Sequence, residues 1–266
     1  MNSKYEIQEA NEATEKTEST VDSIATLDIS GQFFDELVDD TENCLSLDNQ
    51  VCLPNLVSKR DFLFRAVDQN YRSRILIDDV SFYSVTESDS AEKISSLIAQ
   101  EFGGYCGQFI VLDGMACVGG NSLSFAKRFG HVFANELNEG RYNMLIHNLK
   151  NVMGFRNITY KKKCVLEVAS SLPKYDVLFL DPEWGGPGYI NEEKLRLNIS
   201  DEPLEEFCMR ILNTRSGVKL IALKLPINFD HEYFEDFVAL QGYEYILNKD
   251  LRKMTLAIIR RRLDGP

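Results

Sequence analysis

The sequence predicts an α/β protein whose core is a mostly parallel β-sheet. Short apolar runs, such as QFIVL at 108–112 and DVLFL at 176–180, alternate along the chain with segments of helical periodicity. This alternation is typical of strand–helix–strand crossovers, which place parallel strands side by side. Three of the four clearest strands end in an acidic residue, namely Asp113, Glu136 and Asp181. Ligands of parallel sheets bind beyond the carboxyl ends of the strands, so these acids indicate a ligand site.

The expected elements follow from these patterns. Before the sheet we expect a helix over 59–71, an extended piece over 75–83, and a second helix capped by Thr86 or Ser88. The strands are expected at 108–112, 131–134, 158–160, 176–180, 220–225, 244–248 and 254–260. The helices between them are expected at 122–129, 140–153, 204–212 and 234–241.

Charge divides the chain into two unlike parts. Residues 1–50 hold 13 acidic residues and two lysines, whereas residues 51–266 hold 28 acidic and 27 basic residues. We expect 1–50 to be an acidic, disordered leader, 51–100 a small helical N-terminal lobe, and 101–266 the main domain. The leader is either a solvated tail or a docking segment for a protein partner.

The composition excludes several classes of protein. No run approaches the roughly 18 apolar residues of a membrane-spanning helix. The N-terminal residues show neither the apolar region of a signal peptide nor the arginine bias of a transit peptide. The six cysteines form no C-x-x-C pair and no cluster with histidine, so neither a zinc site nor any other metal site is expected. Scattered cysteines favour a reducing compartment, the nucleus or the cytoplasm.

A glycine-containing turn, LDGMACVGGNS at 112–122, lies between a predicted strand and a predicted helix. Its glycines allow a ligand to approach the backbone, and the N–H groups of the helix start favour an anion. The spacing matches neither the dinucleotide fingerprint nor a phosphate-binding loop. Glu136, at the end of the next strand, is placed to accept the hydroxyls of a ribose. Alternatively, Glu136 complements the dipole of the following helix.

The segment LFLDPEWGGPGY at 178–189 is the more specific motif. Asp181 and the carbonyl of Pro182 can accept hydrogen bonds from an exocyclic amine and so orient its lone pair. Trp184 is the only tryptophan of the chain, and the glycines and proline that follow it favour an indole that stacks on a base, best on a cationic one. The competing interpretation is a core tryptophan beside a tight turn.

This segment resembles the S/D-P-P-W-G-G-P-x-Y motif of trimethylguanosine synthases, the RNA cap guanine-N2 methyltransferases. The similarity extends to DGMACVGGNSLSFA at 113–126, FYSVTE at 82–87 and KLPINFD at 224–230, and covers roughly residues 62–260. The sequence departs from the family pattern at three places. Glu183 stands for the second proline, Cys117 stands for the first glycine, and the acid after the third strand falls near Cys164–Val165.

The resemblance implies a Rossmann-like class I methyltransferase, with a mostly parallel seven-stranded sheet, helices on both faces and a small helical N-terminal lobe. It implies methyl transfer from S-adenosylmethionine to N2 of the 7-methylguanosine in an RNA 5′ cap, which makes capped RNA the expected partner. The cofactor-binding residues would be Thr86, Asp113, Gly119, Gly120, Asn121 and Glu136. Asp181 and Pro182 would hold the amine, and Trp184, Ser84 and Asn228 would bind the cap.

Two other functions are compatible with these residues. Loops of the type D-P-x-aromatic serve amine methylation in general, so the chain could instead methylate guanine N2 or adenine N6 at internal nucleic-acid sites. It could also be a non-catalytic cap-binding protein that keeps Trp184, which the residues at 117, 183 and 164–165 favour. Basic residues at 59–74, 161–163 and 260–262 are candidates for phosphate contacts or for solvated surface.

Overall fold

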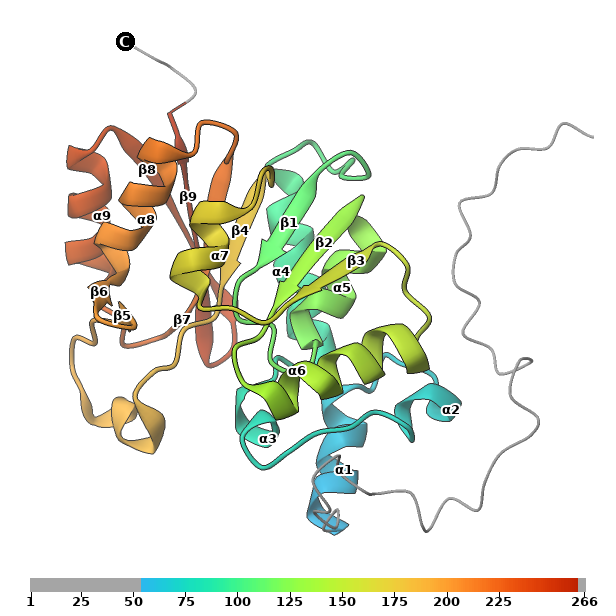
Figure 1. Cartoon of the computed structure of the whole chain (residues 1–266). Coiled ribbons are helices and arrows are strands. Elements are labelled where there is room, and N and C mark those ends of the chain that lie inside the picture. Colours follow the sequence, from blue (N-terminus) through green and yellow to red (C-terminus); the bar gives the residue numbers. More distant parts are fainter. Residues whose placement is uncertain (1–53, 263–266) are drawn as a thin grey trace, which may run out of the picture.

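The computed structural model describes residues 54–262, and these are organised around one seven-stranded sheet of order β3-β2-β1-β4-β7-β9-β8 (Figure 1). The first five strands in this order run parallel, and β9 pairs antiparallel with both β7 and β8. The strands are β1 Ile110–Asp113, β2 His131–Asn135, β3 Ile158–Lys161, β4 Val177–Leu180, β7 Leu220–Pro226, β8 Tyr243–Leu251 and β9 Met254–Arg261. The predicted seven-stranded, mostly parallel sheet is confirmed. A separate two-stranded ladder, β5 Asn198–Ile199 with β6 Glu202–Pro203, was not predicted.

Alternate residues of the strands enter two different cores, one on each face of the sheet. In β1, for example, Val111 belongs to one cluster and Leu112 to the other, because successive side chains of a strand point to opposite faces. Residues of α4 Ser88–Gln100, α5 Gly120–Arg128 and α6 Glu139–Ile146 belong to the first cluster. Residues of α7 Val165–Ser171, α8 Leu204–Thr214 and α9 His231–Leu240 belong to the second. Helices therefore cover both faces, as expected.

The N-terminal segment differs from the predicted pattern. A single helix over 59–71 is wrong: α1 Pro54–Leu63 ends early, and the carboxylate of Asp68 caps a short α2 Gln69–Arg72. The expected extended piece stops at Asp78, where reciprocal 2.7 Å hydrogen bonds with Ser81 start the short helix α3 Ser81–Ser84. Glu87, rather than Thr86 or Ser88, caps α4, because its carboxylate accepts the N–H groups of the first turn. The boundaries of α2, α3 and α4 are thus set by the capping side chains of Asp68, Asp78 and Glu87.

One further expected helix is present with a change of type, and one helix was missed. The helix expected over 140–153 is α6, which continues as a π-helix over His147–Val152. The helix α7, which starts after Cys164, was missed because it has only seven residues. The leader expected at 1–50 lies outside the described residues.

The π-helix carries a buried asparagine that joins the N-terminal segment to the sheet. Asn148 is 1% exposed, and its side-chain amide donates to the carbonyls of Leu76 (2.9 Å) and Val118 (3.0 Å). Its Oδ1 accepts the N–H of Leu76 at 2.8 Å. One side chain thus ties the segment before α3 to the turn before α5.

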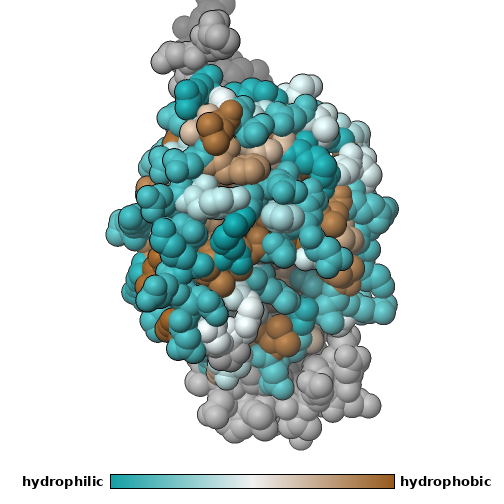
Figure 2. Space-filling model, turned by 90° about the vertical axis from the view of Figure 1, so that its left-hand side faces the viewer, coloured by the Kyte–Doolittle hydropathy of each residue, from teal (hydrophilic) through white to brown (hydrophobic). Residues whose placement is uncertain are grey.

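No helix in the described part of the chain is long and apolar enough to cross a membrane. Seen from the side that carries α8 and α9, the surface is largely hydrophilic and its hydrophobic residues form small separate groups (Figure 2). This face therefore shows no extended apolar patch of the kind that marks obligate contacts.

We expect Asn148→Ala to destabilise the fold by about 2–4 kcal/mol, because it removes three hydrogen bonds and leaves buried backbone groups unpaired. Denaturant unfolding measures this change. Asn151→Ala, on the exposed side of the same π-helix, is the matched control and should change stability by less than about 0.5 kcal/mol. Equal effects of both substitutions would contradict the tying role of Asn148.

Candidate active site

The three strand-end acids meet at one edge of the sheet. Asp113 ends β1, and Glu136 and Asp181 directly follow β2 and β4, the two strands that flank β1. Because the three strands are parallel, their carboxyl ends lie together. Besides burial, the negative charges of Asp181 and Glu136 both raise the pKa of Asp113, as expected for carboxylates that lie close together. The expected convergence of the acids is thus present.

Asp113 is fully buried. Its Oδ2 accepts a 2.6 Å hydrogen bond from the hydroxyl of Ser122, in the first turn of α5, and its Oδ1 has no partner among the described residues. Burial raises the pKa of this carboxyl to about 7; the hydrogen bond from Ser122 opposes the rise and the nearby charge of Asp181 adds to it. Asp113 therefore combines a free acceptor atom with a charge that is readily gained or lost near neutral pH.

The glycine-containing turn brings the N-terminal segment against α5. Gly119, with φ +105°, precedes α5 in the left-handed region. A Cβ on Gly120 would lie 2.5 Å from the carbonyl oxygen of Thr86, so only glycine fits there without a shift. Beside this contact, the side-chain amide of Asn121 donates to the hydroxyl of Thr86 at 2.9 Å. Thr86, Gly120 and Asn121 thus form one close contact between segments far apart in the sequence.

Glu136 fixes the shape of the same turn. Its Oε2 accepts the N–H of Cys117 at 3.0 Å, and its Oε1 accepts the N–H of Asn138, the cap of α6, at 2.8 Å. Arg141 lies 3.6 Å from Oε1. The carboxylate therefore supports the start of α6, in line with the second interpretation of this residue. Each oxygen also keeps a second lone pair, so the acceptance of ribose hydroxyls stays a prediction.

The loop after β4 carries Asp181 beside a buried lysine. The Nζ of Lys224, in β7, lies 2.7 Å from Oδ2 of Asp181, and their side chains are 6% and 14% exposed. Burial raises the pKa of Asp181, while Lys224 and a hydrogen bond with Thr86 lower it. Thr86 therefore bonds to Asn121 of the glycine-containing turn and lies near enough to Asp181 of this loop to lower its pKa. The next residue, Pro182, is buried, and Glu183 is exposed.

Trp184 is half-buried at the border of the second core rather than enclosed in it. Its ring contacts Tyr189 edge to face at 5.2 Å between centroids, and Nζ of Lys224 lies 5.5 Å from the ring centroid. Its indole Nε1 has no partner within residues 54–262. The expectation that this tryptophan is not a fully enclosed core residue agrees with this placement.

The remaining two predicted residues, Asn228 and Ser84, form no hydrogen bond with the three acids within residues 54–262. The amide of Asn228 donates to the carbonyls of Tyr189 and Glu192, each at 2.8 Å, so it holds the loop that follows Trp184. Its Oδ1 is buried and finds no partner in the described region. Ser84 is exposed at the end of α3, two residues before Thr86.

Comparison with known proteins identifies the family. A sequence profile described as RNA cap guanine-N2 methyltransferase matches residues 108–250. The chain belongs to this family. Uncharacterized protein L320 of Acanthamoeba polyphaga mimivirus is 32% identical over 240 residues, which cover 81% of this chain and 91% of that protein. Trimethylguanosine synthase of Schizosaccharomyces pombe is 27% identical over 183 residues, covering 65% of this chain and 72% of the synthase.

Solved methyltransferase structures are more distant. Precorrin-6y C5,15-methyltransferase of Geobacter metallireducens has 19% identity and a TM-score of 0.47, covering 71% of this chain and 98% of its own. Magnesium protoporphyrin IX methyltransferase of Synechocystis, solved with bound S-adenosylhomocysteine, has 10% identity and a TM-score of 0.48, covering 70% and 88%. Membership of this family identifies the sheet described above as a Rossmann-like class I methyltransferase fold. It also identifies S-adenosylmethionine as the cofactor.

The residues at the strand ends fit such a cofactor. Asp113 Oδ1 and Asn121 Oδ1 are buried acceptors without partners among the described residues, and buried polar atoms are rarely left so. The cofactor offers cationic and hydroxyl groups to such acceptors. The glycines at 119 and 120 are required by packing, since a Cβ on Gly120 would meet the Thr86 backbone and one on Gly119 would meet Leu149 at 3.0 Å.

Sequence reasoning missed two residues of this site. Asn135, 1% exposed at the end of β2, donates to the carbonyls of Gly114 and Lys163 and so ties the first turn to the loop after β3. Lys224 was part of the quoted KLPINFD segment but was given no role. The available signal was a polar residue in a largely apolar strand, at the end of HVFAN for Asn135 and within LIALKLP for Lys224.

Several of the candidate phosphate contacts have acidic partners. Arg65 pairs with Asp89 and Glu87, and Arg260 with Glu101 and Glu244. Lys162 pairs with Glu139. These side chains therefore form ion pairs on the surface of the fold. Exposed pairs of this kind are weak, so a phosphate can replace the acidic partner.

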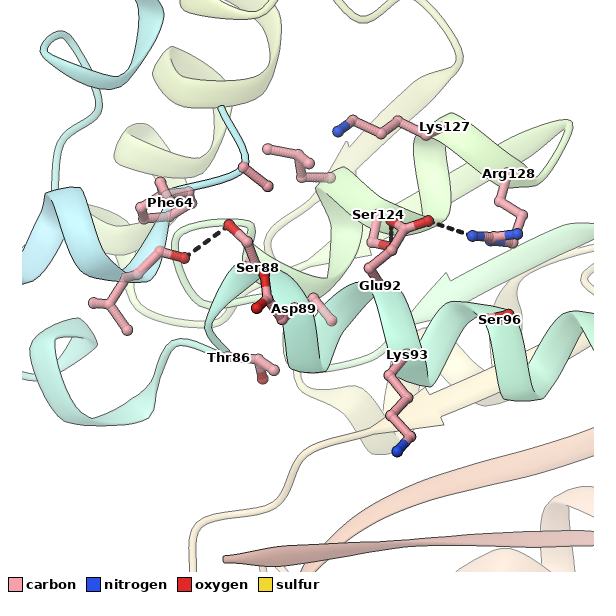
Figure 3. A pocket seen from close by; sticks show the side chains of 15 residues that line it. Phe64, Thr86, Ser88, Asp89, Glu92, Lys93, Ser96, Ser124, Lys127 and Arg128 are labelled. Carbon is pink, nitrogen blue, oxygen red and sulfur yellow. Dashed lines mark hydrogen bonds and ion pairs between the residues drawn. The ribbon is translucent and has the colours of Figure 1, made fainter. Parts of the chain in front are cut away.

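A cavity of about 520 Å³ lies between α1, α4 and α5 (Figure 3). Thr86 and Gly120 line it, whereas none of the three strand-end acids does. Glu92 of α4 bonds to Ser124 and Arg128 of α5 across it, and Ser88 bonds to the carbonyl of Leu63. The cavity therefore borders the Thr86–Gly120 contact but is separate from the acidic edge.

We expect Gly120→Ala to lower stability by about 1–3 kcal/mol, because the added Cβ must push the Thr86 backbone away. The same shift should weaken the binding of S-adenosylhomocysteine. Thermal unfolding and calorimetry measure the two effects. Gly217→Ala, whose Cβ would meet no atom within 4 Å, is the control. Unchanged binding and stability in Gly120→Ala would contradict the close contact.

The raised pKa of Asp113 predicts a pH-dependent stability. The native carboxyl holds its proton up to about pH 7, whereas the unfolded one loses it near pH 4. The contribution of Asp113 is therefore fully present below pH 4 and is lost as pH rises toward 7. Between pH 5 and pH 8 the loss should be about 2–3 kcal/mol.

Denaturant unfolding at several pH values measures this slope. Asp113→Asn should flatten it by that amount, and the exposed Asp236→Asn in α9 should leave it unchanged. If stability falls equally steeply with pH in Asp113→Asn, the pH dependence comes from other groups.

Proposed function

We propose that this methyltransferase transfers a methyl group from S-adenosylmethionine to N2 of the 7-methylguanosine in an RNA 5′ cap. The observation that carries the proposal is the loop after β4. Asp181 has one carboxylate oxygen directed to Lys224, and a half-buried tryptophan with a free indole N–H stands three residues further on. An acceptor for an amine and a platform for a base are thus joined in one loop, beside the residues that fit the cofactor.

Asp181 and Pro182 would orient the amine. With Oδ2 of Asp181 engaged by Lys224, its Oδ1 accepts one N–H of the guanine N2 amine, and the carbonyl of Pro182 accepts the other. Both hydrogen bonds direct the nitrogen lone pair away from the loop. The bound cofactor supplies an electrophilic methyl group on its sulfonium. Positioning therefore provides the main part of the catalysis, and no residue is assigned as a dedicated base.

Trp184 would recognise the methylated base. The 7-methyl group gives guanine a positive charge, and a cation is attracted by the face of an indole. Asn228 holds the loop over residues 189–192 in place and offers its unpartnered Oδ1. Ser84, at the end of α3, contributes from the N-terminal side.

The cofactor would be held between Asp113, the turn at 119–121 and Glu136. Thr86 closes this group from the N-terminal segment through its contacts with Asn121 and Asp181. In this arrangement, capped RNA is the partner of the site, and the domain 101–266 works together with the lobe at 51–100.

Calorimetric titration with S-adenosylhomocysteine and then with 7-methylguanosine triphosphate tests the proposal. We expect the wild type to bind both. Trp184→Ala should lose about 5- to 150-fold in affinity for the cap nucleotide, since stacking on an aromatic ring contributes about 1–3 kcal/mol. Its affinity for S-adenosylhomocysteine should stay the same. Tyr233→Ala, which removes a partly exposed aromatic ring on α9, is the control.

Other outcomes select the alternatives. Cap binding without cofactor binding would indicate a non-catalytic cap reader. Cofactor binding with no effect of free 7-methylguanosine nucleotides would indicate methylation at internal nucleic-acid sites. Failure to bind either ligand would overturn the cap assignment.

A further inference from the structure

Lys224 is a buried lysine to which the proposed function assigns no role beyond its contact with one oxygen of Asp181. It lies in β7, in the otherwise apolar run LIALKLP, and is 5% exposed. Lysine is rarely buried without a partner of opposite charge. Its partner here is Asp181, at 2.7 Å. The same ammonium lies 5.5 Å from the ring centroid of Trp184.

The charges around Asp181 come from several elements. Lys224 contacts it from β7, and Thr86, in the segment before α4, is near enough to lower its pKa. Asp113, at the end of β1, lies near it, and Glu136, which follows β2, lies near Asp113. Arg141 lies closer to Glu136 and Asp78 than to this pair. Within residues 54–262, Lys224 is therefore the cation in direct contact with Asp181.

The ionisation of Asp181 decides whether it can hold an amine. As a carboxylate it accepts an N–H and leaves the nitrogen lone pair free. As a neutral acid it carries an O–H donor, which would bond to that lone pair and block its attack. Burial raises the pKa of Asp181, and Lys224 is the largest influence that lowers it.

We propose that Lys224 is a positioning residue of the methylation site, which keeps Asp181 ionised and holds one of its oxygens so that the other faces the amine. This inference rests on the proposed function. Lys224 acts through Asp181 and does not touch the reacting atoms. Lys224 also lies close to Trp184. A change in the ionisation of the Lys224–Asp181 pair therefore changes the charge beside the indole on which the base would stack.

The pH profile of methylation provides the first test. The probe is a 7-methylguanosine cap nucleotide, and kcat/KM is measured from pH 5.5 to 9. In Lys224→Met, the acid limb should move to higher pH, so that the loss relative to wild type is at least tenfold greater at pH 6 than at pH 9. Lys224→Arg keeps the charge and should keep the wild-type limb. Lys253→Met, at the exposed turn between β8 and β9, should leave the profile unchanged.

Trp184 provides a second test that needs neither activity nor cofactor. Because it is the only tryptophan, its fluorescence emission reports on the neighbouring Lys224–Asp181 pair. The pH midpoint of its change should rise by at least one unit in Lys224→Met and should disappear in Asp181→Asn. Lys224→Gln serves in place of Lys224→Met if thermal unfolding shows that the latter does not fold.

The two tests separate the failure of each proposal. A loss of activity that is equal at all pH values, or an unmoved fluorescence midpoint, would overturn the role of Lys224 while the cap methyltransferase stands. A wild type that methylates no cap nucleotide would overturn the proposed function. The fluorescence midpoints would then still decide whether Lys224 sets the ionisation of Asp181.

Discussion

The gathering of three carboxylates at one buried edge is the constraint on which the rest of this structure depends. Parallel pairing of β1 with β2 and β4 brings Asp113, Glu136 and Asp181 together, and like charges in a poorly solvated place repel strongly. Each acid is compensated in a different way. Asp113 accepts a hydroxyl hydrogen bond and has a raised pKa, Glu136 accepts two backbone N–H groups, and Asp181 pairs with a lysine. The three carboxyl groups therefore differ in their hydrogen-bond partners and in their tendency to ionise, although they lie at the same edge of the sheet.

The N-terminal segment is part of this edge and not an appendage to it. Residues such as Phe64 and Ile77 belong to the same core as the first face of the sheet. Thr86 bonds to Asn121 in the glycine-containing turn and lies near Asp181 in the loop after β4. Asn148 holds the same segment through its hydrogen bonds with the backbone of Leu76. A displacement of this segment would therefore reach both halves of the site through direct contacts.

The sequence was informative where local pattern determines structure. Apolar runs and their terminal acids predicted the sheet and the meeting of the acids, because strand direction alone decides which ends coincide. The DPEW loop was recognised because its composition is unusual for any regular element. The Lys224–Asp181 pair and the amide contacts of Asn148 could not be predicted, since their partners are 43 and 72 residues away. The break between α1 and α2 was missed because the capping carboxylate of Asp68 competes with an apparently continuous helical pattern.

Cys117 shows how the turn before α5 is maintained. Its φ of +51° is costly for a residue with a side chain, by about 1–2 kcal/mol, and glycine would adopt it freely. The hydrogen bond from its N–H to Glu136 holds the backbone in that conformation. With a side chain at this position, the unfolded chain also samples fewer conformations than it would with glycine. The turn therefore has its conformation set by protein contacts alone, and a ligand that binds to it should lose little affinity to the ordering of the protein.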